Sequence, residues 1–220
     1  MNNKYYDYSN IDFSKIKLIQ FIKKDPDNPE HQLSDTVEKI FQKEYIPLLL
    51  TNIKPVDNLL LTHLNIQYKR MTKIFITTPV MMNIFGINKR YSTFEMNLSF
   101  LNIDDNPKMK EFYDAIKTFE YTQMAQIGLT NDTQSNYLSQ IKQSKDKQYD
   151  PYITIKLPFR YNKFDIDIYN KTYSGQSIID IKHGNHIRCN IFIDKIQKYN
   201  GKYICKWKCS YIEIINKNDD

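Results

Sequence analysis

Short runs of branched and aromatic residues dominate the hydrophobic pattern of the chain, and such runs are typical of β-strands. Before residue 144 they predict strands at 13–22, 58–68, 72–78 and 91–101. The charged stretch 144–151 ends in a proline and predicts a hinge. Beyond it the pattern predicts only strands, at 152–157, 163–169, 177–182, 186–193 and 202–215.

One segment has a clear helical period. Met109, Phe112, Ile116 and Phe119 recur at spacings of three and four, which predicts a helix that begins at Asn106–Pro107 and ends near Gly128. Shorter helices are predicted after Ser34, an N-cap candidate, and at 136–144. The stretches 85–90 and 194–201 predict turns.

Many short strands at this spacing favour a small barrel or sandwich. Because strands lie on both sides of the helical region, we expect one mainly β domain over residues 1–220. It has a helical insertion at about 106–145 and a short acidic end at 216–220.

Charge is distributed unevenly along the chain. The net charge is +6, but residues 151–220 carry 12 Lys/Arg against 7 Asp/Glu, which is +5. This third would attract polyanions. The five glycines are too scattered for a Gly-rich phosphate loop. Three cysteines without a secretory start predict a reducing compartment. No apolar run approaches the ~20 residues of a membrane span, so no membrane partner is expected.

The two strands predicted at 186–193 and 202–215 each have an apolar and a cationic face. With a period of two, Cys189, Cys205, Trp207, Cys209 and Tyr211 face inward, which makes the cysteines core residues and the tryptophan a packing anchor. The opposite faces carry Arg188, Phe192, Lys206 and Lys208. Either these faces are an ordinary solvated exterior, or they line a groove that follows a phosphate backbone.

Three further groups of residues leave alternatives open. His183, His186 and the cysteines suggest zinc, yet the sequence lacks a C-x-x-C knuckle. Asp165 and Asp167, two apart on one strand face, suggest a magnesium-dependent nuclease, but no third acidic residue lies nearby. The basic groups at 69–73 and 89–91 are either solvated turns or phosphate contacts.

The run KIFITTPVMMNIFGINKRYSTFEMNLSF and the following DDNPKMKEFYDAIKTFE resemble single-stranded-DNA-binding proteins of large nucleocytoplasmic DNA viruses. That family is similar to the replicative single-strand-binding proteins of T-odd phages. The shared features are Thr78–Pro79, Phe85–Gly86, Ser99–Phe100, the helix from Phe112 to Phe119, Leu157–Pro158, Gly184 and Gly201–Lys202 through Trp207–Lys208. The resemblance covers roughly residues 60–215.

The resemblance implies an OB-fold, a five-stranded barrel with extra strands and one main helix. It implies non-specific, non-catalytic binding of single-stranded DNA in viral replication, recombination or repair, without cofactor or metal. The alternatives are a structural or assembly protein of the virion and the nuclease. We expect a location in the host cytoplasm or a viral replication factory. Replication proteins are further expected partners, and a homodimer is left open.

Nine residues are expected to contact nucleic acid. For the phosphates these are Arg160, Lys163, Arg188, Lys202, Lys206 and Lys208, and for stacking Tyr161, Phe192 and Tyr203. Phage-type proteins of this kind end in a long acidic tail that recruits partners, whereas this chain ends with Asp219 and Asp220. Recruitment through such a tail is therefore not expected.

Overall fold

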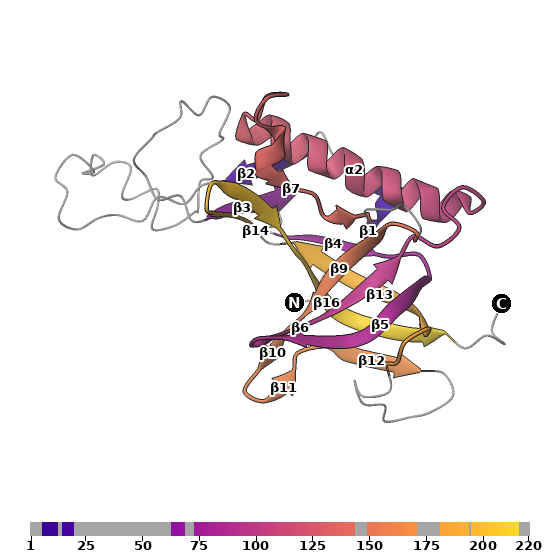
Figure 1. Cartoon of the computed structure of the whole chain (residues 1–220). Helices are drawn as coiled ribbons and strands as arrows, with labels where there is room; N and C mark the ends of the chain where they lie inside the picture. Colours follow the sequence, from indigo (N-terminus) through magenta and orange to yellow (C-terminus); the bar gives the residue numbers. More distant parts are fainter. Residues whose placement is uncertain are drawn as a thin grey trace.

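The computed structural model describes residues 6–12, 15–19, 63–68, 73–143, 149–170, 181–193 and 195–215 (Figure 1). The helix predicted after Ser34 lies outside these ranges, as do Lys69, Arg70, most of the strand predicted at 177–182 and the acidic end 216–220. Within the described residues, no helix is both long and apolar enough to cross a membrane.

Five strands close into a barrel. They are β5 (Met81–Arg90), β6 (Thr93–Ser99), β9 (Tyr152–Leu157), β13 (His186–Ile193) and β16 (Trp207–Ile215). The ring order is β5-β6-β9-β16-β13, and β13 pairs back to β5. The β9–β16 pair is parallel, and the other four pairs are antiparallel. This arrangement is that of an OB-fold and confirms the predicted mainly β, five-stranded barrel.

Inward-facing side chains of alternate residues fill the barrel. Ile153, Ile155 and Leu157 of β9 are buried, and so are Cys189 and Cys209 on the facing strands. Burying a side chain of this size contributes about 1.5–3 kcal/mol, so these positions stabilise the closed ring. The predictions that the three cysteines are core residues and that Trp207 is a packing anchor are confirmed, because all four are buried.

A bulge changes the predicted faces of β16. Asn190 pairs with Tyr211 but Ile191 pairs with Cys209, so Ser210 is an extra residue on β16. Beyond this bulge Ile212 faces inward, whereas Tyr211 is only partly buried. The prediction that Tyr211 shares the inward face with Cys209 was therefore wrong, because one inserted residue reverses the alternation.

A second sheet extends from one side of the barrel. Its order is β2 (Ile16–Ile19), β3 (His63–Tyr68), β14 (Lys195–Tyr199), β15 (Lys202–Cys205) and β7 (Tyr137–Leu138). The hairpin β14–β15 connects β13 with β16, so both barrel strands continue into this sheet. The predicted turn at 194–201 is wrong, because the described part of this stretch, 195–201, is strand up to Tyr199 and turns at Asn200–Gly201.

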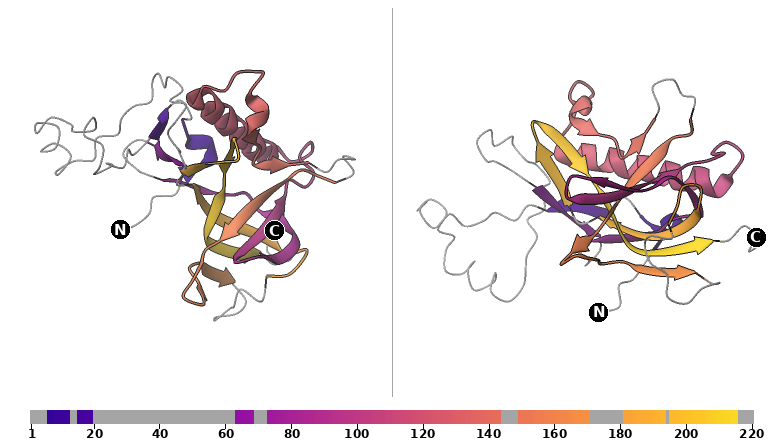
Figure 2. Two further views of the ribbon diagram at one scale, coloured as in Figure 1. Left: turned by 60° about the vertical axis from the view of Figure 1, so that its left-hand side comes forward. Right: turned by 60° about the horizontal axis from the view of Figure 1, so that its bottom comes forward.

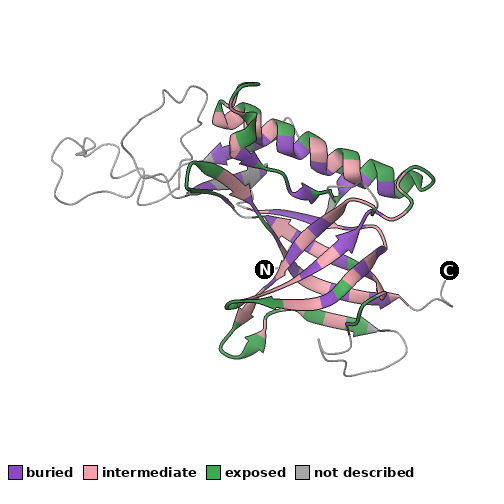
Figure 3. Cartoon of the chain, viewed as in Figure 1, coloured by how far each residue is buried: buried purple, intermediate pink, exposed green. Residues whose placement is uncertain are grey.

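Helix α2 (Pro107–Ile127) lies across one end of the barrel beside the second sheet (Figures 1 and 2). Asn106 caps its first turn by accepting a hydrogen bond from the Met109 amide at 3.1 Å, and Gly128 ends it in the left-handed conformation. Its apolar stripe, Met109, Phe112, Ile116 and Phe119, is buried. Figure 3 shows this buried face turned toward the sheets. The predicted helix is confirmed.

Two local predictions were wrong. Residues 85–90 continue β5, and Gly86 (φ +71°) lies where the pairing of β5 with β6 shifts register. Residues 136–144 hold β7 and β8 (Ile141–Lys142), which pair with β15 and β9. In both segments pairing with distant strands outweighs the local preference for a turn or a helix.

The remaining described strands are short. They are β1 (Tyr6–Asp7), β4 (Ile74–Thr77), β10 (Phe159–Arg160), β11 (Lys163–Phe164) and β12 (Asp167–Asn170). Strands β1 and β12 are the outer strands of the large sheet, β4 lies between β1 and β13, and β10 and β11 pair only with each other. The predicted strand 163–169 is therefore two strands, and Asp165 and Ile166 separate them.

Candidate nucleic-acid interface

A row of paired residues on the outer face crosses four barrel strands and the adjoining β4, whose member Phe75 is buried. Glu95 pairs with Lys156, Lys156 with Lys208, Lys208 with Phe192, and Phe192 with Phe75 of β4. We call these five residues the transverse row. Neighbouring strands are about 4.8 Å apart, so the row spans roughly 19 Å. An extended polyanion laid along it would contact several strands in succession.

Four lysines gather around the middle of the row, and we call them the lysine cluster: Lys142, Lys156, Lys206 and Lys208. Loss of solvation lowers the pKa of Lys156, and repulsion from Lys206 and Lys208 adds to this. Desolvation, with repulsion from Arg90 and Lys206, also lowers the pKa of Lys142. The repulsive contribution to these shifts comes from positive charges that the fold holds close together, in a place where burial already disfavours charge.

Little negative charge balances the cluster. Glu95 favours the charged forms of both Lys142 and Lys156, but the same carboxylate also pairs with Arg90, at 3.2 Å from its Nε. The pKa shifts of both lysines remain downward in spite of this carboxylate. A bound anion would relieve the repulsion, so the cluster is suited to phosphate groups.

Phe192 is the more exposed of the two aromatic residues of the row. Its ring packs against Phe75 with centroids 5.4 Å apart, and the ammonium groups of Lys73 and Lys208 lie 5.2 and 5.8 Å from its centroid. The side chain is half-buried. Phe192 thus lies between two lysines. If a base stacked on its ring, these lysines could bind the phosphates on either side of that nucleotide.

Two hairpin tips beside β6 carry exposed tyrosines. Tyr91, after β5, is 98% exposed, and Tyr161, in the β10–β11 turn, is 97% exposed. The hairpins contact each other near these tips, where Phe94 packs against Phe159 and Phe164 with ring centroids 4.9 Å apart. The predicted residues Arg160, Tyr161 and Lys163 therefore lie together at one tip, and all three are exposed.

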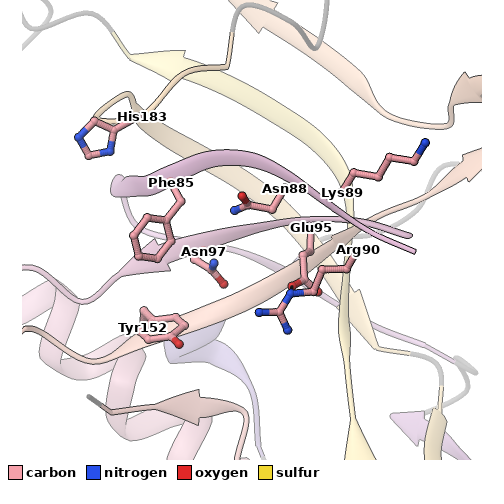
Figure 4. Close-up of a pocket in the computed structure, with 8 residues that line it drawn as sticks. All are labelled: Phe85, Asn88, Lys89, Arg90, Glu95, Asn97, Tyr152 and His183. Atoms are coloured by element: carbon pink, nitrogen blue, oxygen red, sulfur yellow. Dashed lines mark ion pairs between the residues drawn. The ribbon is translucent and has the colours of Figure 1, made fainter. Parts of the chain in front are cut away.

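A pocket of about 620 Å³ opens between the bulge of β5 and the outer face of β6 and β9. We call it the β5 pocket. Its lining side chains are Phe85, Asn88, Lys89, Arg90, Glu95, Asn97, Tyr152 and His183 (Figure 4). It adjoins the transverse row, because Glu95 belongs to both.

The other predicted contact residues lie elsewhere. Arg188 is paired with Glu213, at 3.0 Å, on the part of β16 that β12 borders. Lys202 and Tyr203 belong to β15 in the second sheet, where Lys202 donates to the Ser135 carbonyl at 3.3 Å. The structure thus brings the predicted contact residues together in two groups: Lys206, Lys208 and Phe192 at the transverse row, and Arg160, Tyr161 and Lys163 at the hairpin tip. Arg188, Lys202 and Tyr203 belong to neither group.

Sequence reasoning missed Lys142, Lys156, Phe85 and Tyr152. Alternation along 152–157 was a sufficient signal that Tyr152 and Lys156 face outward together. No local pattern in the sequence predicts that Lys156 lies beside Lys208, because their proximity depends on the parallel pairing of β9 with β16.

The residues proposed for metal chemistry are not arranged as a site. Among the described residues, no three His, Cys, Asp or Glu side chains lie close enough together to hold a metal ion. Asp165 lies before β12, with its amide bonded to the Pro158 carbonyl, while Asp167 is within β12. The two carboxylates thus do not share a continuous strand face.

No protein-family model matches the chain, and no curated protein sequence matches it either. Several solved structures are similar at low identity. The single-stranded DNA-binding protein from bacteriophage Enc34 in complex with ssDNA is 14% identical, with a TM-score of 0.46 over 76% of this chain and 94% of that chain. Gp2.5, a single-stranded DNA-binding protein encoded by bacteriophage T7, is 10% identical, with a TM-score of 0.44 over 67% and 92%.

Proposed function

We propose that the barrel binds single-stranded DNA along the transverse row, without catalysis and without a cofactor. The observation that carries the proposal is the lysine cluster on neighbouring strands, where desolvation and, after it, repulsion between cations lower the pKa values of Lys142 and Lys156. Phosphates placed there neutralise the cations and release the counterions of the nucleic acid.

Exposed aromatic side chains support a single strand over a duplex. Phe85, Tyr91 and Tyr161 are 61%, 98% and 97% exposed, and Phe192 lies on the transverse row. A base can stack on such a ring only when it is not already stacked inside a duplex, and each base stacked in this way contributes about 1–3 kcal/mol. We therefore propose that affinity for oligothymidylate exceeds affinity for duplex of equal length.

The salt dependence of binding tests the role of the lysine cluster. Each phosphate contact on a single strand adds about 0.7 to the slope of log K against log salt. Replacing Lys156 and Lys208 together by alanine should flatten this slope by about 1 to 2. Fluorescence titration with labelled oligothymidylate over a series of salt concentrations measures it.

A matched control separates this effect from a general loss of charge. Lys108 and Lys110 are exposed on α2, so the Lys108→Ala/Lys110→Ala variant loses the same charge outside the row. Its slope should equal that of the wild type. Equal slopes for all three proteins would remove the transverse row from the interface. Arg188→Ala should also change little, because Glu213 already neutralises this side chain.

We extend the proposal to a role in DNA replication, recombination or repair of a large nucleocytoplasmic DNA virus, in the host cytoplasm or a viral replication factory. The order of short motifs across residues 60–215 supports this. Association with replication proteins belongs to the same proposal. Co-purification of the chain with viral replication proteins from infected cells tests it. Nuclease treatment of the extract shows whether that association depends on DNA.

A further inference from the structure

The β5 pocket offers aromatic side chains beside a polar wall. Phe85 lies at the β5 bulge and is 61% exposed, while Tyr152 begins β9 on the same face. Figure 4 shows Phe85, Asn97 and Tyr152 grouped on one side of the pocket, with the Arg90–Glu95 ion pair on the other. The volume of about 620 Å³ is ample for one nucleobase with its sugar.

A chain of hydrogen bonds fixes the orientation of the Asn97 amide. The Lys142 ammonium can only donate, and its Nζ lies 2.9 Å from Thr154 Oγ1, so this oxygen accepts. The Thr154 hydroxyl donates its own hydrogen to Asn97 Oδ1, 2.7 Å away. Because Oδ1 is occupied in this way, Asn97 presents its Nδ2 hydrogens, which have no acceptor among the described residues.

His183, on the rim, is oriented by the same kind of constraint. Its Nδ1 bonds to the carbonyl of Ile84, and since a carbonyl only accepts, Nδ1 carries the hydrogen. Nε2 is then the ring nitrogen left for a ligand. The pocket thus has donors of fixed position at Asn97 and a ring nitrogen of known tautomer at His183.

We propose that the β5 pocket holds one unstacked base of the bound strand, packed against Phe85 and Tyr152, and that Asn97 Nδ2 donates to a carbonyl oxygen of that base. This inference rests on the proposed function and deepens it. Thymine needs only a donor for its carbonyl oxygens, whereas the paired contact of an asparagine with adenine N6 and N7 also needs Oδ1 as an acceptor, and Thr154 already donates to that oxygen. The protein therefore prefers thymine to adenine at one position of an otherwise sequence-tolerant site.

The test compares the affinities of oligothymidylate and oligoadenylate of equal length at one salt concentration. Oligoadenylate stacks on itself, so the informative quantity is the change in the affinity ratio between variant and wild type. Asn97→Ala should lower the preference for thymine by roughly 2- to 10-fold, the effect of one hydrogen bond. Phe85→Ala should weaken binding of both oligonucleotides by roughly 5- to 100-fold, the effect of one stacked base.

Thr154 is a positioning residue in this scheme and provides the matched pair of variants. Thr154→Val keeps the shape but removes the hydroxyl, so the Asn97 amide loses its fixed orientation and the preference should fall as in Asn97→Ala. Thr154→Ser keeps the hydroxyl and should keep the wild-type ratio. Circular dichroism confirms that each variant is folded, which we expect because Phe85, Asn97 and Thr154 lie on the outer face.

The outcomes separate the two proposals. If the wild type binds single strands but Asn97→Ala and Thr154→Val keep its affinity ratio, the base pocket is overturned and the proposed function stands. Phe85→Ala with wild-type affinity also overturns the pocket. If the wild type binds neither oligonucleotide, both proposals fail together.

Discussion

At the scale of single residues, the interface depends on lysines whose charge the fold disfavours. Desolvation and repulsion from Lys206 lower the pKa of Lys156, so the folded protein holds this proton less tightly than the unfolded chain does. Between the lowered pKa and the ordinary lysine pKa, stability therefore rises with pH. Bound phosphate favours the charged form, so the proton affinity lost on folding is recovered on binding.

A pH dependence of binding follows for Lys156. Because binding takes up a proton, affinity should fall as pH rises through the lowered pKa. Lys156→Arg keeps its charge at every accessible pH and should bind about tenfold more tightly than the wild type at the alkaline end, since a charged contact contributes about 1.5 kcal/mol. Titrations with oligothymidylate from neutral pH upward measure this. The exposed Lys108→Arg is the control, and parallel profiles for all three proteins would contradict the prediction.

At the scale of elements, the bulge of β5 positions the pocket. Gly86 has φ +71°, and a Cβ there would lie 3.4 Å from the His183 amide nitrogen. The connection 181–185, which leads into β13, is held against the same bulge, where the Asn83 amide donates to the Asn185 carbonyl at 2.8 Å. The bulge thus sets the place of Phe85 and His183 together.

Substituting Gly86 should weaken DNA binding in addition to lowering stability, whereas an equivalent substitution elsewhere should lower stability alone. An alanine in the left-handed region costs about 1–2 kcal/mol. Gly128 has φ +80° with open space around it, so Gly128→Ala bears the same conformational cost away from the pocket. Urea denaturation should show similar losses for both variants, whereas only Gly86→Ala should weaken binding of oligothymidylate. If Gly86→Ala and Gly128→Ala bound oligothymidylate with equal affinity, the bulge would not position the site.

The sequence predicts those elements whose signal is local. The helix over α2 follows from its own apolar period, and the outward faces of Lys206 and Lys208 follow from alternation. β7 and β8 were missed because they exist only by pairing with β15 and β9. For the same reason the lysine cluster was found only in part, since Lys156 reaches Lys208 through a parallel pairing between strands distant in sequence.

At the scale of the whole molecule, the barrel, the second sheet and α2 meet at Trp207. This side chain is 1% exposed, begins β16 where β15 ends, and lies 5.7 Å from the Phe119 ring of α2. Buried polar groups join the same parts. Glu120 of α2 accepts hydrogen bonds from Lys117, Ser139 and the amide of Gln140, which hold the segment before β8 against the helix.

This shared core predicts a single cooperative unfolding transition. Fluorescence of Trp207, the only tryptophan, reports the junction, whereas far-UV circular dichroism reports all strands and α2, and the two transitions in urea should coincide. Glu120→Gln should lower the free energy of unfolding by about 1–3 kcal/mol as measured by either signal, because an amide cannot satisfy all three donors. Wild-type affinity for oligothymidylate should persist, since Glu120 lies outside the transverse row. If circular dichroism alone shifted, α2 and its contacts would unfold independently of the barrel, and the junction at Trp207 would not couple them.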